Sequence, residues 1–294
     1  MSPRLRWALA WVIATALLVI CARTIDWSHA ATAITTVTAG WLVAAIVANT
    51  LILACWGAFW RTLTPDREPR VTYSRMFGIV STASSLMNTV PFGGGHAASV
   101  ALLSKRGGLS VPGALAVLAL DQLGEGLIKV TIFLLVALVV PLPAWMRAGV
   151  TAASIGVAVW FVTLGVASRW RSELKLLHSV RRSFTAFACV TAMKGAELLA
   201  IIAVQRAFGL DLAWGSSLLV LAAVVLGTML PVAPGNLGTY EASVFLAYRY
   251  LGISPDQALA LAIVQHIAFM LPAVGVGYLF VSAQALARSA IASR

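Results

Sequence analysis

The sequence predicts an all-α protein that crosses a membrane about six times and carries two further broken, re-entrant hairpins in inverted repeats. Of its 294 residues, 60% are hydrophobic and only 11% are charged. Ordinary globular domains are about 45–50% apolar and about 25% charged, so a soluble core would not hide this much apolar surface. The apolar residues also fall in long runs, and a helix needs about 20 residues to cross roughly 30 Å of hydrocarbon.

Six apolar runs are long enough to span a bilayer. They cover residues 7–22, 40–60, 113–140, 148–167, 184–205 and 256–282. Two further stretches, 76–104 and 213–250, are interrupted near their middles by Pro and Gly, so we expect each to fold as a hairpin of half-helices. The alternative is a set of Pro-kinked spanning helices, in which 213–250 makes two crossings joined by a turn. No polar linker divides the chain, which predicts a single transmembrane domain over 1–294.

An internal repeat relates the two interrupted stretches. Shifted by 144 residues, the segment from Gly94 (GGHAASVALLSKRGGLSVPGALA) aligns without gaps with the segment from Gly238 (GTYEASVFLAYRYLGISPDQALA), with ten identities in 23 positions. Each copy follows an apolar half-helix that ends in Pro and Gly, and each precedes a long apolar helix. The repeat predicts two equivalent cores, at about 76–140 and 213–282.

The basic residues are distributed unequally between alternate connections, although the net charge is +11. One set of connections carries Arg4, Arg6, Arg61, Arg67, Arg70, Arg75, Lys105, Arg106, Arg169, Arg171, Lys175, Arg181, Arg182, Arg288 and Arg294. The other set carries Arg23, Arg147, Arg206 and Arg249. Cytoplasmic loops are rich in Lys and Arg, so both termini are expected in the cytoplasm of a bacterial cell, beneath its inner membrane. Topology accounts for these charges without nucleic acid, and 213–250 then enters from the side opposite to 76–104.

Ionisable residues inside apolar segments are costly and usually face a bundle interior or an aqueous cavity. Asp121, Glu125 and Lys129 follow one another at i, i+4 and i+8, so they form one polar stripe on a helix. Lys194 and Glu197 form a second pair, at i and i+3. These charges either line a substrate path or simply neutralise one another between helices, and the sequence leaves both interpretations open.

The two Pro/Gly breaks are the other candidate site, because the N-termini of half-helices offer free N–H groups to a phosphate. Glu241 falls in the first turn after the second break, His96 follows the glycines of the first, and His266 lies inside the last long helix. The predicted substrate-binding residues are Pro91, Gly93, Gly94, Gly95, His96, Asp121, Glu125, Lys129, Pro234, Gly235, Asn236, Gly238 and Glu241.

No motif in the chain calls for a metal or a cofactor. The three cysteines are scattered through apolar segments, without disulfide or metal-ligand spacing. The sequence contains no G-x-x-x-x-G-K-[ST], so ATP is not expected to drive a reaction. It also contains no G-x-S-x-G and no H-E-x-x-H. An intramembrane enzyme that uses His96, Asp121, Glu125 or His266 remains an alternative.

Pro231, Pro234, Gly235, Gly238 and Glu241 match the pattern P-x-x-P-G-x-x-G-x-x-E, which resembles the signature of the lysylphosphatidylglycerol synthase transmembrane region, or flippase-like, family. The resemblance implies movement of an amphipathic lipid, with an anionic or zwitterionic headgroup, across the cytoplasmic membrane. The family often carries an Arg after the first Gly-rich element and an E-R-x-x-D-type cluster in the next helix. This chain has His96 and LDQLGE (120–125) there instead. Because the chain ends after its last apolar run, we expect no aminoacyl-transferring domain and no synthase activity; a non-transporting partner subunit is a further alternative.

Overall fold

The computed structural model describes residues 37–64, 71–90, 94–144, 147–152, 154–156, 159, 180–229 and 233–292. In this part of the chain the regular structure is helical, without strands. The named helices are α3 (Ala39–Leu63), α4 (Tyr73–Thr89), α5 (Gly94–Lys105), α6 (Val111–Val139), α8 (Val180–Ala207), α9 (Trp214–Gly227), the 3-10 turn η2 (Pro234–Asn236), α10 (Thr239–Tyr250) and α11 (Pro255–Ala292). The predicted all-α membrane fold is confirmed.

Four of the described helices are long and apolar enough to cross a membrane: α3, α6, α8 and the 255–283 part of α11. They coincide with the predicted crossings at 40–60, 113–140, 184–205 and 256–282. The predicted crossing at 7–22 lies outside the described residues, and so does most of the one at 148–167.

The two interrupted stretches form pairs of short helices. α4 and α5 have 17 and 12 residues, and α9 and α10 have 14 and 12. At 1.5 Å per residue these helices are about 18–26 Å long, which is shorter than the hydrocarbon layer. Their lengths favour broken hairpins over the alternative of kinked helices that each cross the whole membrane.

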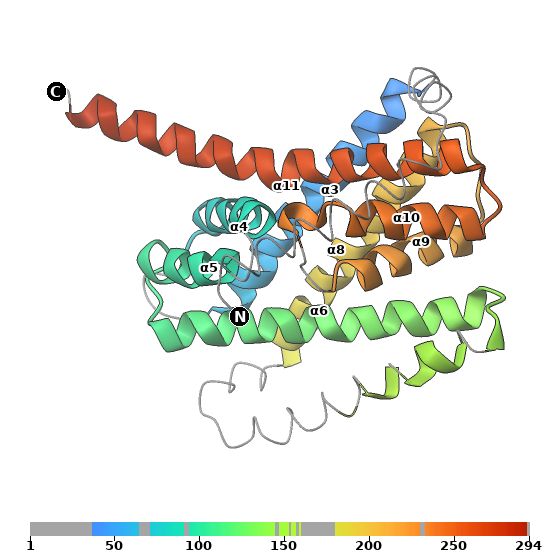
Figure 1. Cartoon of the computed structure of the whole chain (residues 1–294). Coiled ribbons are helices and arrows are strands. Elements are labelled where there is room, and N and C mark those ends of the chain that lie inside the picture. The colour runs from blue at the N-terminus through green and yellow to red at the C-terminus, as the bar shows by residue number, and fades with distance from the viewer. Residues whose placement is uncertain are drawn as a thin grey trace, which may run out of the picture.

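The long helices and the hairpins are arranged reciprocally. In Figure 1, α6 and α11 run in opposite directions, with the α4–α5 hairpin at the end where α6 begins and the α9–α10 hairpin at the end where α11 begins. Each long helix packs against the hairpin of the other copy, α11 on α4 and α6 on α9, while α3 packs along α8. Two inverted copies would produce this arrangement.

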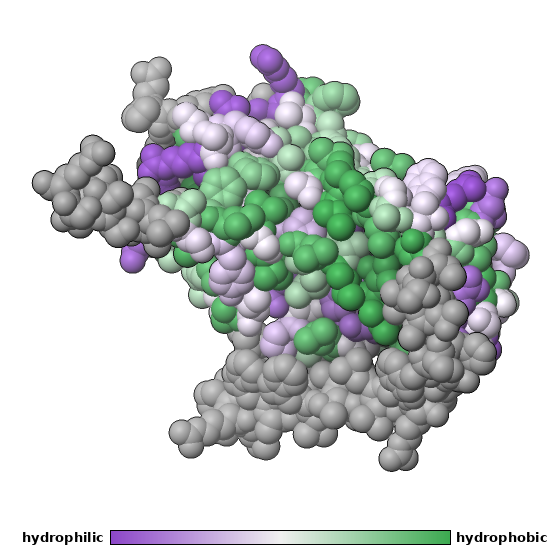
Figure 2. Space-filling model, turned by 90° about the horizontal axis from the view of Figure 1, so that it is seen from above, coloured by the Kyte–Doolittle hydropathy of each residue, from purple (hydrophilic) through white to green (hydrophobic). Residues whose placement is uncertain are grey.

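The tips of the two hairpins meet inside the bundle. Gly235, which has φ +61°, packs so closely that a Cβ on it would lie 3.3 Å from the carbonyl oxygen of Asn88 and 2.8 Å from Cε of Met270. Only a residue without a side chain allows this approach in a left-handed conformation. Figure 2 shows hydrophobic residues over the middle of the molecule and hydrophilic residues mainly towards the two ends, as expected for a protein whose middle lies in lipid.

Candidate functional site

A cavity of about 240 Å³ lies where the long helices meet the hairpin tips. Of the named helices only α5 contributes nothing to its wall. The lining residues are Ile52, Trp56, Met87, Asp121, Gln122, Glu125, Lys129, Met193, Lys194, Glu197, Val224, Thr228, Asn236, Tyr240 and Phe269. Residues from both halves of the chain therefore build one cavity, in which charged side chains lie beside apolar ones.

A line of alternating charges connects α6 to α8 across this cavity. The ammonium of Lys194 lies 2.9 Å from Glu197 and 3.3 Å from Glu125, and Glu125 lies 3.6 Å from Lys129. The predicted pairs within each helix are confirmed, and Lys194 joins them into one network. The side chains of Lys194, Glu125 and Glu197 are only 15–17% exposed, so these charges need one another to remain inside the bundle.

Asp121 is held differently from the other charges. Its Oδ1 accepts hydrogen bonds from the indole N–H groups of Trp56 and Trp60, both at 2.8 Å, and its Oδ2 accepts one from Gln122 at 3.3 Å. Asp121 is 1% exposed. Among the described residues no Lys, Arg or His forms an ion pair with it. The described lining thus holds three carboxylates and two ammonium groups, a formal excess of one negative charge.

Asn236 lines the cavity in an unusual backbone conformation. It is a non-glycine residue with φ +54°, and its Oδ1 is buried with no hydrogen-bond partner among the described residues. Residues held in this conformation without glycine are uncommon and cluster at functional positions. This oxygen is itself shielded from contact with water, so Asn236 contributes to the cavity wall without exposing this acceptor to the cavity.

The second break is fixed by Glu241 and His266. The Gly238 amide donates to Glu241 Oε2 at 2.7 Å, and His266 Nδ1 lies 2.8 Å from Glu241 Oε1. His266 Nε2 lies 2.9 Å from the Gly235 carbonyl oxygen, which can only accept, so Nε2 carries hydrogen. The Gly238 amide is occupied by the chain's own carboxylate and is not free for a phosphate.

A chain of buried hydrogen bonds extends behind the cavity. Tyr240 is stacked on His266 with ring centroids 4.3 Å apart, and its hydroxyl accepts a hydrogen bond from Gln265 at 3.1 Å. Gln265 in turn accepts one from Tyr248, which accepts from Gln205 at 3.1 Å. These bonds fix the position of Tyr240, whose ring forms part of the cavity wall.

The cavity includes four of the predicted site residues: Asp121, Glu125, Lys129 and Asn236. The others lie elsewhere or are not described. Pro91 and Gly93 lie outside the described residues, Gly94 and Gly95 pack against the end of α4, and His96 is exposed on α5. Pro234, Gly235, Gly238 and Glu241 shape the second hairpin tip behind the lining.

Several lining residues were missed as site residues, chiefly Trp56, Lys194, Glu197 and Tyr240. A signal existed for the tryptophans: Trp56 and Trp60 stand at i and i+4 on an apolar helix, where each indole N–H needs an acceptor. Lys194 and Glu197 were recognised as a pair, but nothing in the sequence placed them opposite Glu125.

The fold and the site together define a multi-pass α-helical membrane protein with a charged chamber inside its bundle. Residues 7–277 match the family model described as the lysylphosphatidylglycerol synthase TM region, and the chain belongs to this family. It is also 24% identical over 282 residues to a UPF0104 membrane protein of Methanothermobacter thermautotrophicus, an alignment that covers 80% of this chain and 83% of the relative.

Proposed function

We propose that the protein moves an amphipathic phospholipid across the cytoplasmic membrane without ATP. The observation that carries the proposal is the charged cavity, which both hairpin tips and all four long helices line. Charges inside a membrane bundle mark the paths of polar substrates, and transporters with inverted repeats bind substrate where their broken helices meet. A family of membrane proteins named after a lipid synthase is consistent with a lipid substrate.

The residues around the cavity favour a zwitterionic headgroup within the anionic or zwitterionic class. Lys129 is the more exposed of the two cavity lysines, at 29%, and has a single partner 3.6 Å away among the described residues, so it can bind a phosphate. The carboxylate of Asp121, which lines the cavity without an ion-pair partner among the described residues, can accept a hydrogen bond from an amine or a hydroxyl. The described lining carries one more negative than positive formal charge. It therefore disfavours a headgroup that is anionic and has no positively charged group of its own.

In the part of the chain that the structure describes, the residues named for the enzyme alternative do not gather in one place. Its proposed acids and bases are dispersed: His96 is exposed on α5, and His266 is bonded to Glu241 and to the Gly235 carbonyl. Only Asp121 and Glu125 share the cavity, and Glu125 is engaged by Lys194 and Lys129.

Reconstitution in proteoliposomes tests the proposal. Vesicles that contain phosphatidylethanolamine or phosphatidylglycerol are prepared with and without the protein, and inner-leaflet headgroups are followed as they become accessible to impermeant reagents. We expect faster exposure with the protein, greatest for phosphatidylethanolamine. Asp121→Asn should slow it, because the change removes the cavity's charge excess while preserving shape. Asp211→Asn is the matched control, because this carboxylate is 76% exposed and pairs with Arg206 in a loop. Equal exposure in protein-free and protein-containing vesicles would refute lipid movement.

A further inference from the structure

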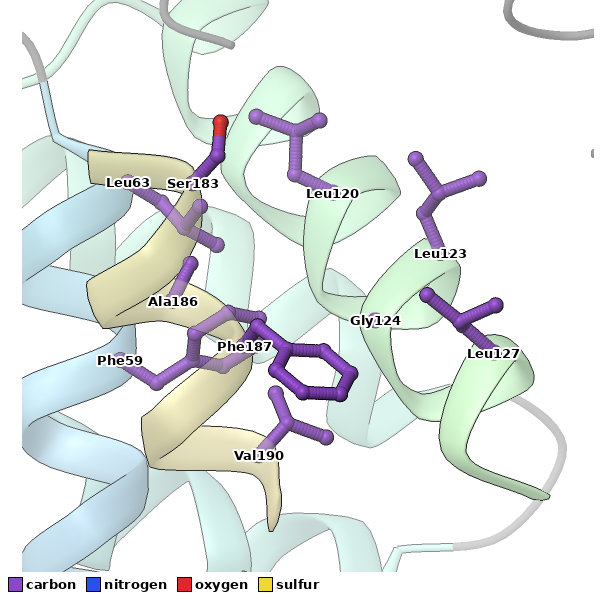
Figure 3. Close-up of a pocket in the computed structure, with 10 residues that line it drawn as sticks. All are labelled: Phe59, Leu63, Leu120, Leu123, Gly124, Leu127, Ser183, Ala186, Phe187 and Val190. Carbon is purple, nitrogen blue, oxygen red and sulfur yellow. The ribbon is translucent and has the colours of Figure 1, made fainter. Parts of the chain in front are cut away.

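A second hollow lies next to the charged cavity, between α6 and α8 (Figure 3). It has a volume of about 170 Å³ and is lined by Phe59, Leu63, Leu120, Leu123, Gly124, Leu127, Ser183, Ala186, Phe187 and Val190, all apolar except Ser183. Its floor is buried, with Phe59 and Val190 each 2% exposed. Its rim is open, with Phe187 51% and Leu127 45% exposed. We call this hollow the α6/α8 groove.

The groove and the cavity follow each other along α3 and α8. On α3, Phe59 of the groove stands three residues from Trp56 of the cavity. On α8, Val190 of the groove stands four residues before Lys194 of the cavity. Residues three or four apart share a helix face, so one trough along α3 and α8 changes from apolar to charged within a single turn.

Helix α6 crosses this trough at Gly124. A Cβ on Gly124 would lie 2.9 Å from the Phe59 ring and 3.3 Å from Val190 Cγ2, so glycine permits the close crossing. The neighbouring residue, Glu125, already belongs to the cavity and is bound to Lys194 across the α6–α8 seam at 3.3 Å. On α6 itself the groove residues and the cavity residues lie on opposite faces, so this helix separates the two spaces where it crosses α3 and α8. The ion pair between Glu125 and Lys194 holds α6 against α8 on the cavity side of the crossing.

We propose that the α6/α8 groove holds one hydrocarbon chain of a lipid whose headgroup occupies the cavity, and that this lipid enters sideways between α6 and α8. The inference rests on the proposed function and adds the route and the place of the chain. A lipid is the ligand that requires an apolar surface and a charged surface one after the other, as they occur along α3 and α8, and its entry requires α6 to separate from α8 at the Gly124 crossing. The exposed rim gives the chain access from the bilayer, and the headgroup competes with Lys194 for Glu125 as it enters.

The physics of the bilayer gives this proposal a specific signature. A hydrocarbon chain gains almost nothing by exchanging bilayer for groove, because lipid tails are as apolar as the side chains of the protein. Selective occupancy must then come from the headgroup. A lipid in the groove should depend on its headgroup, whereas lipid on the ordinary outer surface should not.

Photo-crosslinking separates the two cases. The full-length protein in proteoliposomes is exposed to a phosphatidylethanolamine, or to the diacylglycerol with the same chains, each with a diazirine in one chain. Crosslinks are mapped by mass spectrometry. We expect Phe187 and Leu127 to be labelled several-fold more by the phospholipid than by the diacylglycerol. Leu138, which is 82% exposed and lies outside the groove, should be labelled equally by both.

A glycine pair supplies the matched variants. Gly124→Leu fills the crossing and should abolish the headgroup-dependent labelling, whereas Gly195→Leu should leave it unchanged, because a Cβ on Gly195 meets nothing within 4 Å. Gly124→Ala, with a smaller intrusion, serves if the leucine variant does not fold. Equal labelling of Phe187 by the phospholipid and the diacylglycerol in the unmodified protein would overturn the proposal. So would headgroup-dependent labelling that persists in a folded Gly124 variant.

The groove proposal and the proposed transport function can fail independently of each other. Headgroup-dependent labelling of the groove without lipid movement would leave a lipid-binding groove in a protein that does not transport. Lipid movement without such labelling would overturn the groove and leave transport by another route.

Discussion

Replacing Lys194 with methionine removes the cation that connects two carboxylates across α6 and α8. At an effective dielectric constant of about 20, its contacts with Glu197 at 2.9 Å and Glu125 at 3.3 Å correspond to about 6 and about 5 kcal/mol of attraction, before the cost of desolvation. Methionine has a similar length and no charge, so it leaves Glu197 without a cation. Breaking a buried pair on one side costs about 3–5 kcal/mol, and we expect Lys194→Met to lower the free energy of unfolding by this amount.

Glu197→Gln should lower the free energy of unfolding by less, about 1–3 kcal/mol, because Lys194 is still paired with Glu125 in this variant. The double variant should lose less than the sum of the single variants, with an interaction energy of about 1–3 kcal/mol. Denaturant titration in detergent micelles, followed by circular dichroism, measures all three. Lys105→Met, at an exposed position on α5, is the control and should shift stability by no more than about 0.5 kcal/mol. Losses that add to within about 0.5 kcal/mol would show that the network does not act as a unit.

Three further predictions use other parts of the structure. Gly235→Ala should destabilise the protein more than Gly252→Ala, because both residues have positive φ but only Gly235 is crowded; equal melting temperatures would disprove the contact between the hairpin tips. Glu241→Gln should lower the free energy of unfolding by about 1–3 kcal/mol, because it weakens the bonds of this side chain to the helix terminus and to His266. Lipid movement per folded molecule should stay the same. Loss of movement without loss of stability would place Glu241 in the substrate path. In a cysteine-free background, Lys105→Cys should be protected from an impermeant thiol reagent in intact cells and Asp211→Cys labelled; the reverse pattern would invert the topology.

Most of the helical layout follows from composition and hydrophobic length. Because a spanning helix needs an apolar run of a certain length, the run at 113–140 predicted α6 within two residues at each end. The breaks at Pro and Gly could likewise be predicted from the sequence, because proline removes a helical hydrogen bond and glycine permits positive φ. The number of full crossings stays a prediction, because 7–22 and most of 148–167 lie outside the described residues.

The candidate site was predictable only where its interactions are local. The pairs Glu125–Lys129 and Lys194–Glu197 follow from helix periodicity alone. The Glu125–Lys194 link and the bonds from Trp56 and Trp60 to Asp121 depend on how α3, α6 and α8 pack, which no local pattern specifies. Glu241 was expected beside a substrate, but its bond to His266 forms only when α10 folds back on α11.

The reciprocal packing of the two halves has a consequence for how the protein is made. The hydroxyl of Ser85 in α4 donates to the carbonyl of Val274 in α11, 189 residues later in the chain. At about 5–20 residues per second, a ribosome needs about 10–40 s to synthesise that interval. Throughout this time the hydroxyl-rich face of α4, with Ser81, Ser84 and Ser85, lacks the helix that later buries it. The α4 face of the first hairpin therefore lacks its packing partner in the membrane until α11 has been synthesised and inserted.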